Sequence, residues 1–231
     1  MKWDNLRVPD AWKVSNREAK EVVAREIAQK VENGQVIGVG SGSTSYLAIL
    51  AIAERVKKEG LKVTAVCTSA EVTMACAALD LPVGTLLQYR PDFAFDGADE
   101  VGPDKGLIKG RGGALYLEKI VLDAAPKGYI LVDPSKFVKK LGEKFAVPVE
   151  VMPVALRIVE RELAKLGATE IGMRMATGKD GPIITEHGNL LLDVRFKDIG
   201  KTMERDIKAI TGVIDSGLFQ GRDVEILSTK E

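Results

Sequence analysis

The chain has 231 residues, with 33 acidic and 33 basic side chains, so its formal net charge at pH 7 is zero. This balance excludes a bulk electrostatic attraction to nucleic acid or to an anionic membrane. The longest apolar run, Tyr46–Ala53, is far shorter than the about 20 residues that a membrane span needs. The N-terminal sequence MKWDNLRVPDAW has no apolar core of a signal peptide. We therefore expect a cytoplasmic protein without nucleic-acid or membrane partners.

The small number of histidines and cysteines narrows the possible chemistry. A single histidine, His187, excludes a multi-histidine metal site and argues against a histidine-based catalytic triad. We expect it to be a surface turn residue. Cys67 and Cys76 are too few for a disulfide framework, and we expect reduced, buried thiols. We predict no metal site and no cofactor, which leaves acid–base chemistry to carboxylates or lysines.

The first predicted element is a helix. Residues Asn16–Val31 carry apolar side chains at helical spacing, and Ser15 is a suitable N-cap. Lys20 falls on the more polar side of this helix, where a lysine is normally solvated.

A strand, a glycine-rich turn and a second helix follow. The strand is Gln35–Val39, the turn is Gly40-Ser41-Gly42-Ser43-Thr44, and the helix is Tyr46–Lys58. The N–H groups of such a turn and the helix N-terminus favour phosphate. The turn is not a Walker A loop, because no Lys-Ser/Thr pair follows the glycines, and it is not a clean dinucleotide fingerprint.

The middle of the chain places charged residues after a strand. The expected elements here are strand Leu61–Val66, helix Glu71–Leu79, a short strand at Thr85–Leu87, strand Phe93–Phe95, helix Ala114–Ala125 and strand Gly128–Val132. Asp96 and Asp99 follow Phe93–Phe95, at the strand end where open parallel sheets bind ligands. A glycine-rich turn, Lys109–Gly113, leads into the helix that carries Glu118. Such residues are also common in plain turns and on solvated helix faces.

This alternation of strands and helices predicts an α/β fold with a doubly wound, mostly parallel, Rossmann-like sheet. We expect residues 1–147 and 205–231 to form one domain around this sheet, and we expect this domain to be the catalytic one. Residues 148–204 are expected to form a smaller α+β domain, a helix plus an antiparallel sheet. Its expected elements are helix Ala155–Leu166 and strands Glu170–Ala176, Pro182–Thr185 and Leu190–Phe196. After a helix at Ile199–Ile210, we expect strand Gly212–Phe219 to rejoin the first sheet.

The motifs resemble those of the type A ribose-5-phosphate isomerase family. The resemblance rests on Asp96–Glu100 (DGADE), Lys109–Leu115, Glu118, Gly40–Thr44 and Asp133–Lys136, and it covers roughly Lys20 to Phe219. The chain departs from the common pattern at Arg111, where many members have glycine, and at Ser41, which replaces a frequent threonine. The resemblance implies interconversion of D-ribose 5-phosphate and D-ribulose 5-phosphate in the non-oxidative pentose phosphate pathway, and a homodimer or homotetramer.

The resemblance also implies roles for single residues. Glu118 would be the base that moves a proton between C1 and C2 of the sugar, best served by a pKa raised through partial burial. Lys109 and the turn N–H groups would hold the charge of an enediolate. Asp96, with Lys136 or Asp99, would handle ring opening. The full set of implied substrate-binding residues is Lys20, Gly40, Ser41, Gly42, Ser43, Thr44, Asp96, Gly97, Ala98, Asp99, Lys109, Gly110, Arg111, Gly112 and Lys136.

Two other functions fit parts of this pattern. An acyl-CoA transferase can also place a catalytic glutamate after a glycine-rich turn, but it would need covalent chemistry on Glu118 and room for a pantetheine arm. A sugar-phosphate sensor without catalysis would carry an attached DNA-binding element, and no helix-turn-helix or basic arm occurs in the sequence.

Overall fold

The computed structural model describes residues 14–229. Within them the chain forms two compact units. Unit 1 takes the described parts of Met1–Gly97, Leu117–Ser135 and Asp223–Glu231, and unit 2 takes Ala98–Tyr116 and Lys136–Arg222. These units interleave along the sequence more than the two domains that we expected. The expected division into residues 1–147 with 205–231 and residues 148–204 stays a prediction.

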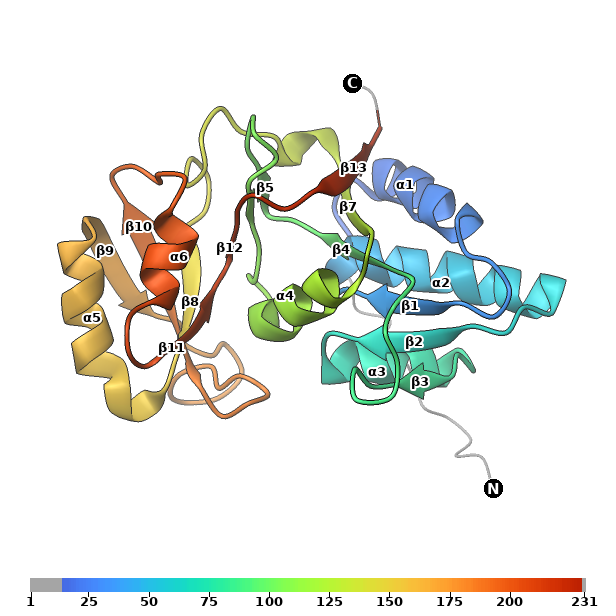
Figure 1. Ribbon diagram of the computed structural model, residues 1–231, viewed down its shortest axis with the longest axis horizontal. Coiled ribbons are helices and arrows are strands. Elements are labelled where there is room, and N and C mark those ends of the chain that lie inside the picture. The colour runs from blue at the N-terminus through green and yellow to red at the C-terminus, as the bar shows by residue number, and fades with distance from the viewer. Residues whose placement is uncertain (1–13, 230–231) are drawn as a thin grey trace. The chain divides into compact units, whose positions relative to one another are not determined.

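Unit 1 is built on a six-stranded sheet in which every neighbouring pair is parallel. The strands are β1 (Val36–Val39), β2 (Thr64–Cys67), β3 (Val83–Gly84), β4 (Phe93–Gly97), β7 (Gly128–Val132) and β13 (Val224–Ser228). Their order across the sheet is β13-β7-β4-β1-β2-β3. The chain therefore starts near the middle and winds outward in both directions, which confirms the doubly wound α/β class (Figure 1).

Helices cover both faces of this sheet because side chains alternate along each strand. Ile37 and Val39 of β1 belong to the core under α1 (Arg17–Gln29), α2 (Gly42–Glu59) and α3 (Ala70–Ala78). Gly38 lies between them and faces the other way, where a Cβ would come within 2.7 Å of Val121 on α4 (Leu115–Ala124). A larger residue at this position would therefore push α4 off the sheet.

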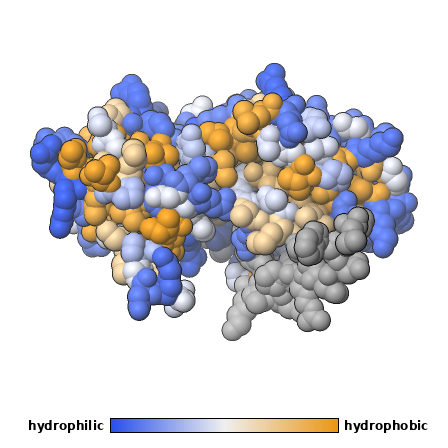
Figure 2. Space-filling model, turned by 90° about the horizontal axis from the view of Figure 1, so that it is seen from below, coloured by the Kyte–Doolittle hydropathy of each residue, from blue (hydrophilic) through white to orange (hydrophobic). Residues whose placement is uncertain are grey.

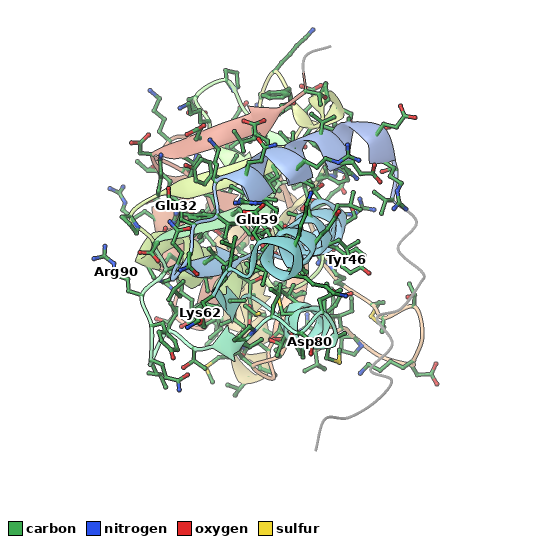
Figure 3. All side chains as sticks on the ribbon, turned by 90° about the vertical axis from the view of Figure 1, so that its right-hand side faces the viewer. Glu32, Tyr46, Glu59, Lys62, Asp80 and Arg90 are labelled. Carbon is green, nitrogen blue, oxygen red and sulfur yellow. The ribbon has the colours of Figure 1, made fainter. Side chains whose placement is uncertain are left out.

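The two longest helices of unit 1, α1 and α2, pack side by side (Figure 3). Arg55 of α2 fixes this contact by donating to the carbonyl oxygens of Ala28 (2.5 Å) and Val31 (3.0 Å) at the end of α1. The same guanidinium pairs with Glu59, labelled in Figure 3, at 2.7 Å. No helix among residues 14–229 is long and apolar enough to cross a membrane.

Unit 2 contains two antiparallel sheets. A four-stranded sheet has the order β11-β8-β10-β9 and a three-stranded sheet has the order β12-β6-β5. The strands are β5 (Glu100–Val101), β6 (Leu107–Ile108), β8 (Val147–Val151), β9 (Ala168–Met173), β10 (Leu190–Phe196), β11 (Val213–Ser216) and β12 (Leu218–Phe219). The helical segments are η2 (Pro153–Ala155), α5 (Leu156–Lys165) and α6 (Met203–Lys208). This smaller α+β part agrees with the expected fold class.

Both sheets of unit 2 share one hydrophobic core. Ile108 of β6 and Leu218 of β12 are buried in the same cluster as Val149 of β8 and Leu192 of β10. Leu163 of α5 closes the cluster from the helical side. This packed core therefore fixes the short strands β6 and β12, and with them Lys109, which follows β6, and Gly217, which precedes β12.

The structure corrects the expected course of the last strands. Residues Gly212–Phe219 do not rejoin the first sheet, because β11 pairs with β8 and β12 pairs with β6. The strand that does join the first sheet is β13, which lies parallel to β7. An apolar run predicts a strand but does not specify its partner, which depends on long-range packing.

Other expectations on element bounds were also wrong. Thr85–Leu87 forms a turn, and Pro182–Thr185 makes only isolated bridges. The helix expected at Tyr46 begins at Gly42, so the glycine-rich turn supplies the first turn of α2. The N-cap of α1 is Asn16, in a left-handed conformation, and not Ser15.

Candidate active site

Asp96 is fixed where β4 ends beside the turn that follows β1. Its Oδ1 accepts hydrogen bonds from the backbone N–H groups of Ser41 (3.1 Å) and Gly97 (2.7 Å), and the residue is only 3% exposed. Gly40 donates its own N–H to the Phe95 carbonyl at 2.8 Å. A Cβ at Gly40 would lie 2.2 Å from Asp96 Cγ, so only glycine leaves room for this carboxylate.

A cluster of hydroxyl groups lies at the carboxyl ends of β1 and β2. Ser41 Oγ is 2.8 Å from Thr68 Oγ1 and 3.2 Å from Ser69 Oγ. Thr68 Oγ1 donates to the Val39 carbonyl, and Ser69 caps α3 by accepting from Val72 N–H. These hydrogen bonds connect the end of β2 and the start of α3 to the turn Gly40–Thr44.

Lys20 is buried and not solvated, which corrects the expectation from its helical position. Only 4% of the residue is exposed, and its Nζ donates to Ser43 Oγ (3.1 Å) and Ser15 Oγ (3.4 Å). Ser43 lies in the first turn of α2, where backbone N–H groups and the helix dipole favour an anion. A buried ammonium group and a helix N-terminus thus lie side by side at this corner of unit 1.

Asp133, directly after β7, ties down the start of α1. Its Oδ1 accepts from Asn16 Nδ2 (3.0 Å) and from the backbone N–H of Ser135 (3.0 Å). Burial raises the pKa of the Asp133 carboxyl, but hydrogen bonds from Ser135 and Asn16, with the charge of Lys20, outweigh burial and leave the pKa below its ordinary value. Asp133 is therefore an ionised partner for the positive charge of Lys20.

Glu118 lies in the first turn of α4, and its residue is only 5% exposed. The carboxylate is therefore largely withdrawn from water. The helix that carries Glu118 was expected at Ala114–Ala125, and α4 spans Leu115–Ala124.

In unit 2, Asp99 binds the backbone of the glycine-rich turn Lys109–Gly113. Asp99 Oδ2 accepts from the N–H of Arg111 (3.2 Å), and Asp99 N–H donates to the Ile108 carbonyl (2.8 Å). Gly110 and Gly113 have φ of +92°, a conformation that favours glycine, and Gly113 N–H donates to the Gly110 carbonyl at 3.0 Å. Arg111 has a negative φ, so its departure from the common family pattern causes no backbone strain.

Lys109 enters this turn from β6 and is buried, with 2% of the residue exposed. Its backbone N–H donates to the Gly217 carbonyl at 2.8 Å, and its Nζ lies 5.5 Å from the centre of the Phe219 ring. Gly217 leaves no room for a side chain, because a Cβ there would come within 2.1 Å of the Lys109 carbonyl oxygen. The segment between β11 and β12 thus fixes the position of the lysine.

Two cations of unit 2 share one aromatic ring. The guanidinium of Arg111 lies 5.1 Å and Nζ of Lys136 lies 5.8 Å from the centre of the Phe145 ring. Lys136 ends the short helix η1 (Pro134–Lys136). An aromatic face at this distance attracts each cation, so the ring keeps two positive side chains near one another.

The loop that carries Phe145 is held by a buried carboxylate. Glu100 is fully buried, and its oxygens accept from the backbone N–H groups of Gly142 (2.7 Å), Lys144 (2.6 Å) and Phe145 (2.7 Å). Three charge-assisted bonds satisfy the desolvated carboxylate. The last residue of the DGADE motif therefore has a clear structural role.

The expected site residues fall into two sets, one in each unit. Unit 1 holds Lys20, Gly40, Ser41, Gly42, Ser43, Thr44, Asp96, Gly97 and Glu118, and unit 2 holds Ala98, Asp99, Lys109, Gly110, Arg111, Gly112 and Lys136. Sequence reasoning did not assign roles to Asp133, to Phe145 or to Arg174, whose guanidinium donates to the carbonyl oxygens of Gly110 and Arg111. The position of Asp133 at the end of a parallel strand was a usable signal, whereas the other two are placed only by long-range contacts.

Comparison with known sequences shows extensive similarity. The profile of ribose 5-phosphate isomerase A (phosphoriboisomerase A) matches residues 64–231. Ribose-5-phosphate isomerase A of Methanocaldococcus jannaschii is 43% identical over 220 residues, covering 94% of this chain and 97% of that protein. The protein of the same description from Thermosynechococcus vestitus is 44% identical over 207 residues, covering 88% and 87%.

Solved structures agree over nearly the whole chain. The ribose 5-phosphate isomerase A structure from Methanocaldococcus jannaschii superimposes with a TM-score of 0.89 at 44% identity, covering 94% of this chain and 96% of that one. A D-ribose-5-phosphate isomerase in complex with phospho-erythronic acid gives a TM-score of 0.87 at 37% identity, covering 92% and 94%.

A parallel sheet with a glycine-rich turn at a helix N-terminus and an aspartate at a strand end is typical of α/β proteins that bind an anionic ligand. The profile match and the relatives specify the kind of enzyme. The chain belongs to the ribose 5-phosphate isomerase A family. The resemblance seen in the sequence motifs is thereby confirmed.

Proposed function

We propose that the chain interconverts D-ribose 5-phosphate and D-ribulose 5-phosphate through an enediolate, with Glu118 as the base. The observation that carries this proposal is the buried carboxylate of Glu118 in the first turn of α4, in a chain of this family. The reaction moves a proton between adjacent carbons and belongs to the non-oxidative pentose phosphate pathway. A group must take the proton and return it, and donors must stabilise the oxyanion that forms meanwhile.

The remaining roles follow from charge and burial. Lys109 and the N–H groups of the Gly110–Gly113 turn would stabilise the enediolate, because a buried ammonium and fixed peptide dipoles act strongly where water is excluded. The first turn of α2, Gly42–Thr44, with Gly40, Ser41 and Lys20, would hold the phosphate. The hydrogen bond from Lys20 to Ser43 supports this assignment.

The direct test is to incubate the protein with ribose 5-phosphate in the presence of EDTA and to monitor ribulose 5-phosphate. We expect turnover that survives the chelator, since the proposed acid–base groups are carboxylates and lysines. Loss of turnover with the chelator would overturn this account of enediolate stabilisation. Absence of turnover in both conditions would overturn the proposed reaction.

Asp96 and Asp99 are proposed to act differently, and separate variants test this division. Asp96 would handle the ring-opening proton, whereas Asp99 would orient hydroxyls and hold the turn through Arg111 N–H. Asp96→Asn should reduce kcat about a hundredfold and remove one limb of the pH–rate profile, since a general acid–base group is lost. Asp99→Asn should lower kcat/KM without changing the shape of the profile. Identical losses with identical profiles would contradict the division of roles.

We also propose a cytoplasmic homodimer or homotetramer. Cys67 and Cys76 are free thiols with their Sγ atoms 3.8 Å apart, which suits a reducing compartment. Hydrophobic side chains are exposed on the surface (Figure 2). In the described part of unit 2 the large exposed hydrophobic residues are Phe137, Met152, Val154, Ile158, Met173, Met175 and Ile184. Such side chains support self-association, which sedimentation velocity would measure; a monomer at all concentrations would contradict it.

A further inference from the structure

Arg174, the residue after β9, donates hydrogen bonds to two carbonyl oxygens of the glycine-rich turn Lys109–Gly113. Its Nη1 donates to the carbonyl of Gly110 (3.0 Å) and to that of Arg111 (2.8 Å). Its Nε donates to Asp193 Oδ2 at 2.9 Å, and Nη2 pairs with Asp193 Oδ1. The Arg174 side chain is only 12% exposed, whereas that of Asp193 is 37% exposed, so the guanidinium itself is largely withdrawn from water.

The backbone of Arg174 is held as firmly as its guanidinium. Its N–H donates to the Leu191 carbonyl and its carbonyl accepts from Ile183 N–H, each at 2.9 Å. Asp193 lies on β10, within the four-stranded sheet. The arginine is therefore anchored to that sheet at the backbone and through a two-point ion pair, which fixes the direction of its Nη1 donor.

These contacts determine which way two consecutive peptide groups face. In a planar trans peptide the C=O and the N–H point in opposite directions. Because the carbonyls of Gly110 and Arg111 face Arg174, the N–H groups of Arg111 and Gly112 face away from it. Arg111 N–H reaches Asp99 Oδ2, whereas Gly112 N–H has no acceptor within residues 14–229.

The orientation needs such a constraint because the turn is rich in glycine. Gly110, Gly112 and Gly113 permit backbone angles that other residues avoid, so a peptide of this turn can flip at little steric cost. A flip of the Arg111–Gly112 peptide would replace an N–H donor by a carbonyl oxygen. The positive guanidinium opposes this flip by attracting both carbonyl oxygens.

We propose that Arg174, held by Asp193, is a positioning residue that aims the N–H group of Gly112 at the enediolate oxygens and keeps the N–H group of Arg111 on Asp99. The proposal rests on the proposed isomerase function and deepens it, since it assigns a device that keeps the oxyanion donors in place before the substrate arrives. Fixed donors stabilise a developing charge without reorganisation during the reaction. The contribution of Arg174 should therefore be felt in the transition state more than in substrate binding.

The test compares Arg174→Lys and Arg174→Met with a matched control, Arg161→Met. Arg161 of α5 also pairs with a carboxylate, Glu162 at 3.0 Å, but it is exposed in unit 2. We expect kcat to fall about tenfold to a hundredfold in the Arg174 variants, as for a small misplacement of catalytic groups. KM should change by less than about threefold. The control should match the wild type.

A binding measurement separates positioning from simple destabilisation. Phospho-erythronic acid carries a planar, charged carboxylate in place of the planar, charged enediolate, and its affinity can be measured by calorimetry without turnover. We expect the Arg174 variants to lose affinity for it in parallel with kcat. Asp193→Asn, which keeps the arginine, should give a smaller loss in the same direction, and it remains informative if an Arg174 variant fails to fold.

Two outcomes would overturn the inference while leaving the isomerase intact. One is an active wild type whose Arg174 variants keep kcat and analogue affinity. The other is a lower melting temperature in these variants with unchanged kcat, which would indicate a structural role only. A wild type that binds the analogue but does not isomerise ribose 5-phosphate would contradict the proposed function. In that case equal affinities of wild type and Arg174 variants would overturn the positioning role as well.

Discussion

Replacing Glu118 with glutamine is expected to abolish turnover of ribose 5-phosphate while leaving its binding nearly unchanged. Glutamine keeps the size and hydrogen-bonding shape of the side chain but cannot accept the proton from carbon. General acid–base groups contribute on the order of a hundredfold to ten-thousandfold, and we expect the upper part of that range because no other base is assigned to this step. Steady-state kinetics would give kcat, and calorimetry would give the affinity for the substrate.

Asp123→Asn is the matched control for this prediction. Asp123 lies on the same helix, α4, and is exposed to solvent. Its replacement removes the same charge from the helix without touching the buried carboxylate, so kcat should stay at the wild-type value. Wild-type turnover by the Glu118→Gln variant would refute the assignment of the base.

Replacing Gly40 with alanine is expected to damage both activity and stability. Gly40 does not have a positive φ, so the obstacle is space alone. The new Cβ would lie 2.2 Å from Asp96 Cγ and 2.3 Å from Oδ1, distances at which either β1 or the carboxylate must move. We expect kcat/KM to fall about a hundredfold, because Asp96 would be misplaced. Unfolding free energy should fall by about 1–3 kcal/mol, as for other overpacked sites.

The control for Gly40→Ala is Gly178→Ala. At Gly178 no atom lies within 4 Å of an added Cβ and φ is not positive. This variant should keep wild-type kinetics and stability by chemical denaturation. If Gly40→Ala also keeps both, the close approach of the turn to Asp96 has no functional importance.

Much of the fold was predictable because its signals are local. Strands Gly128–Val132 and Leu190–Phe196 were predicted with the bounds that the structure has. The first is an apolar run bounded by polar residues, and the second alternates apolar and charged residues over its last five positions. The partner of a strand is not a local property. Residues Gly212–Phe219 were therefore assigned to the wrong sheet, and β13 was missed.

The same distinction applies to the candidate site. Its residues could be named from short motifs, such as Asp96–Glu100 and Lys109–Leu115, and their roles remain predictions. The surroundings of these residues could not be predicted. Lys20 was expected in solvent because helical periodicity places it among polar positions, yet it is buried through contact with Ser43 in another helix. Arg174 reaches the turn from 64 residues away in the sequence, beyond any local pattern.

The position of β13 at the edge of the parallel sheet affects how the protein forms during translation. β7 pairs with β4 on one side and with β13 on the other, but β13 is synthesised almost a hundred residues later. At about 5–20 residues per second, this interval lasts about 5–20 s. Throughout it β7 presents an open edge, the kind of surface at which nascent chains associate. For several seconds of its synthesis, the growing polypeptide therefore exposes an edge of β7, and a chaperone bound there would prevent association with other chains.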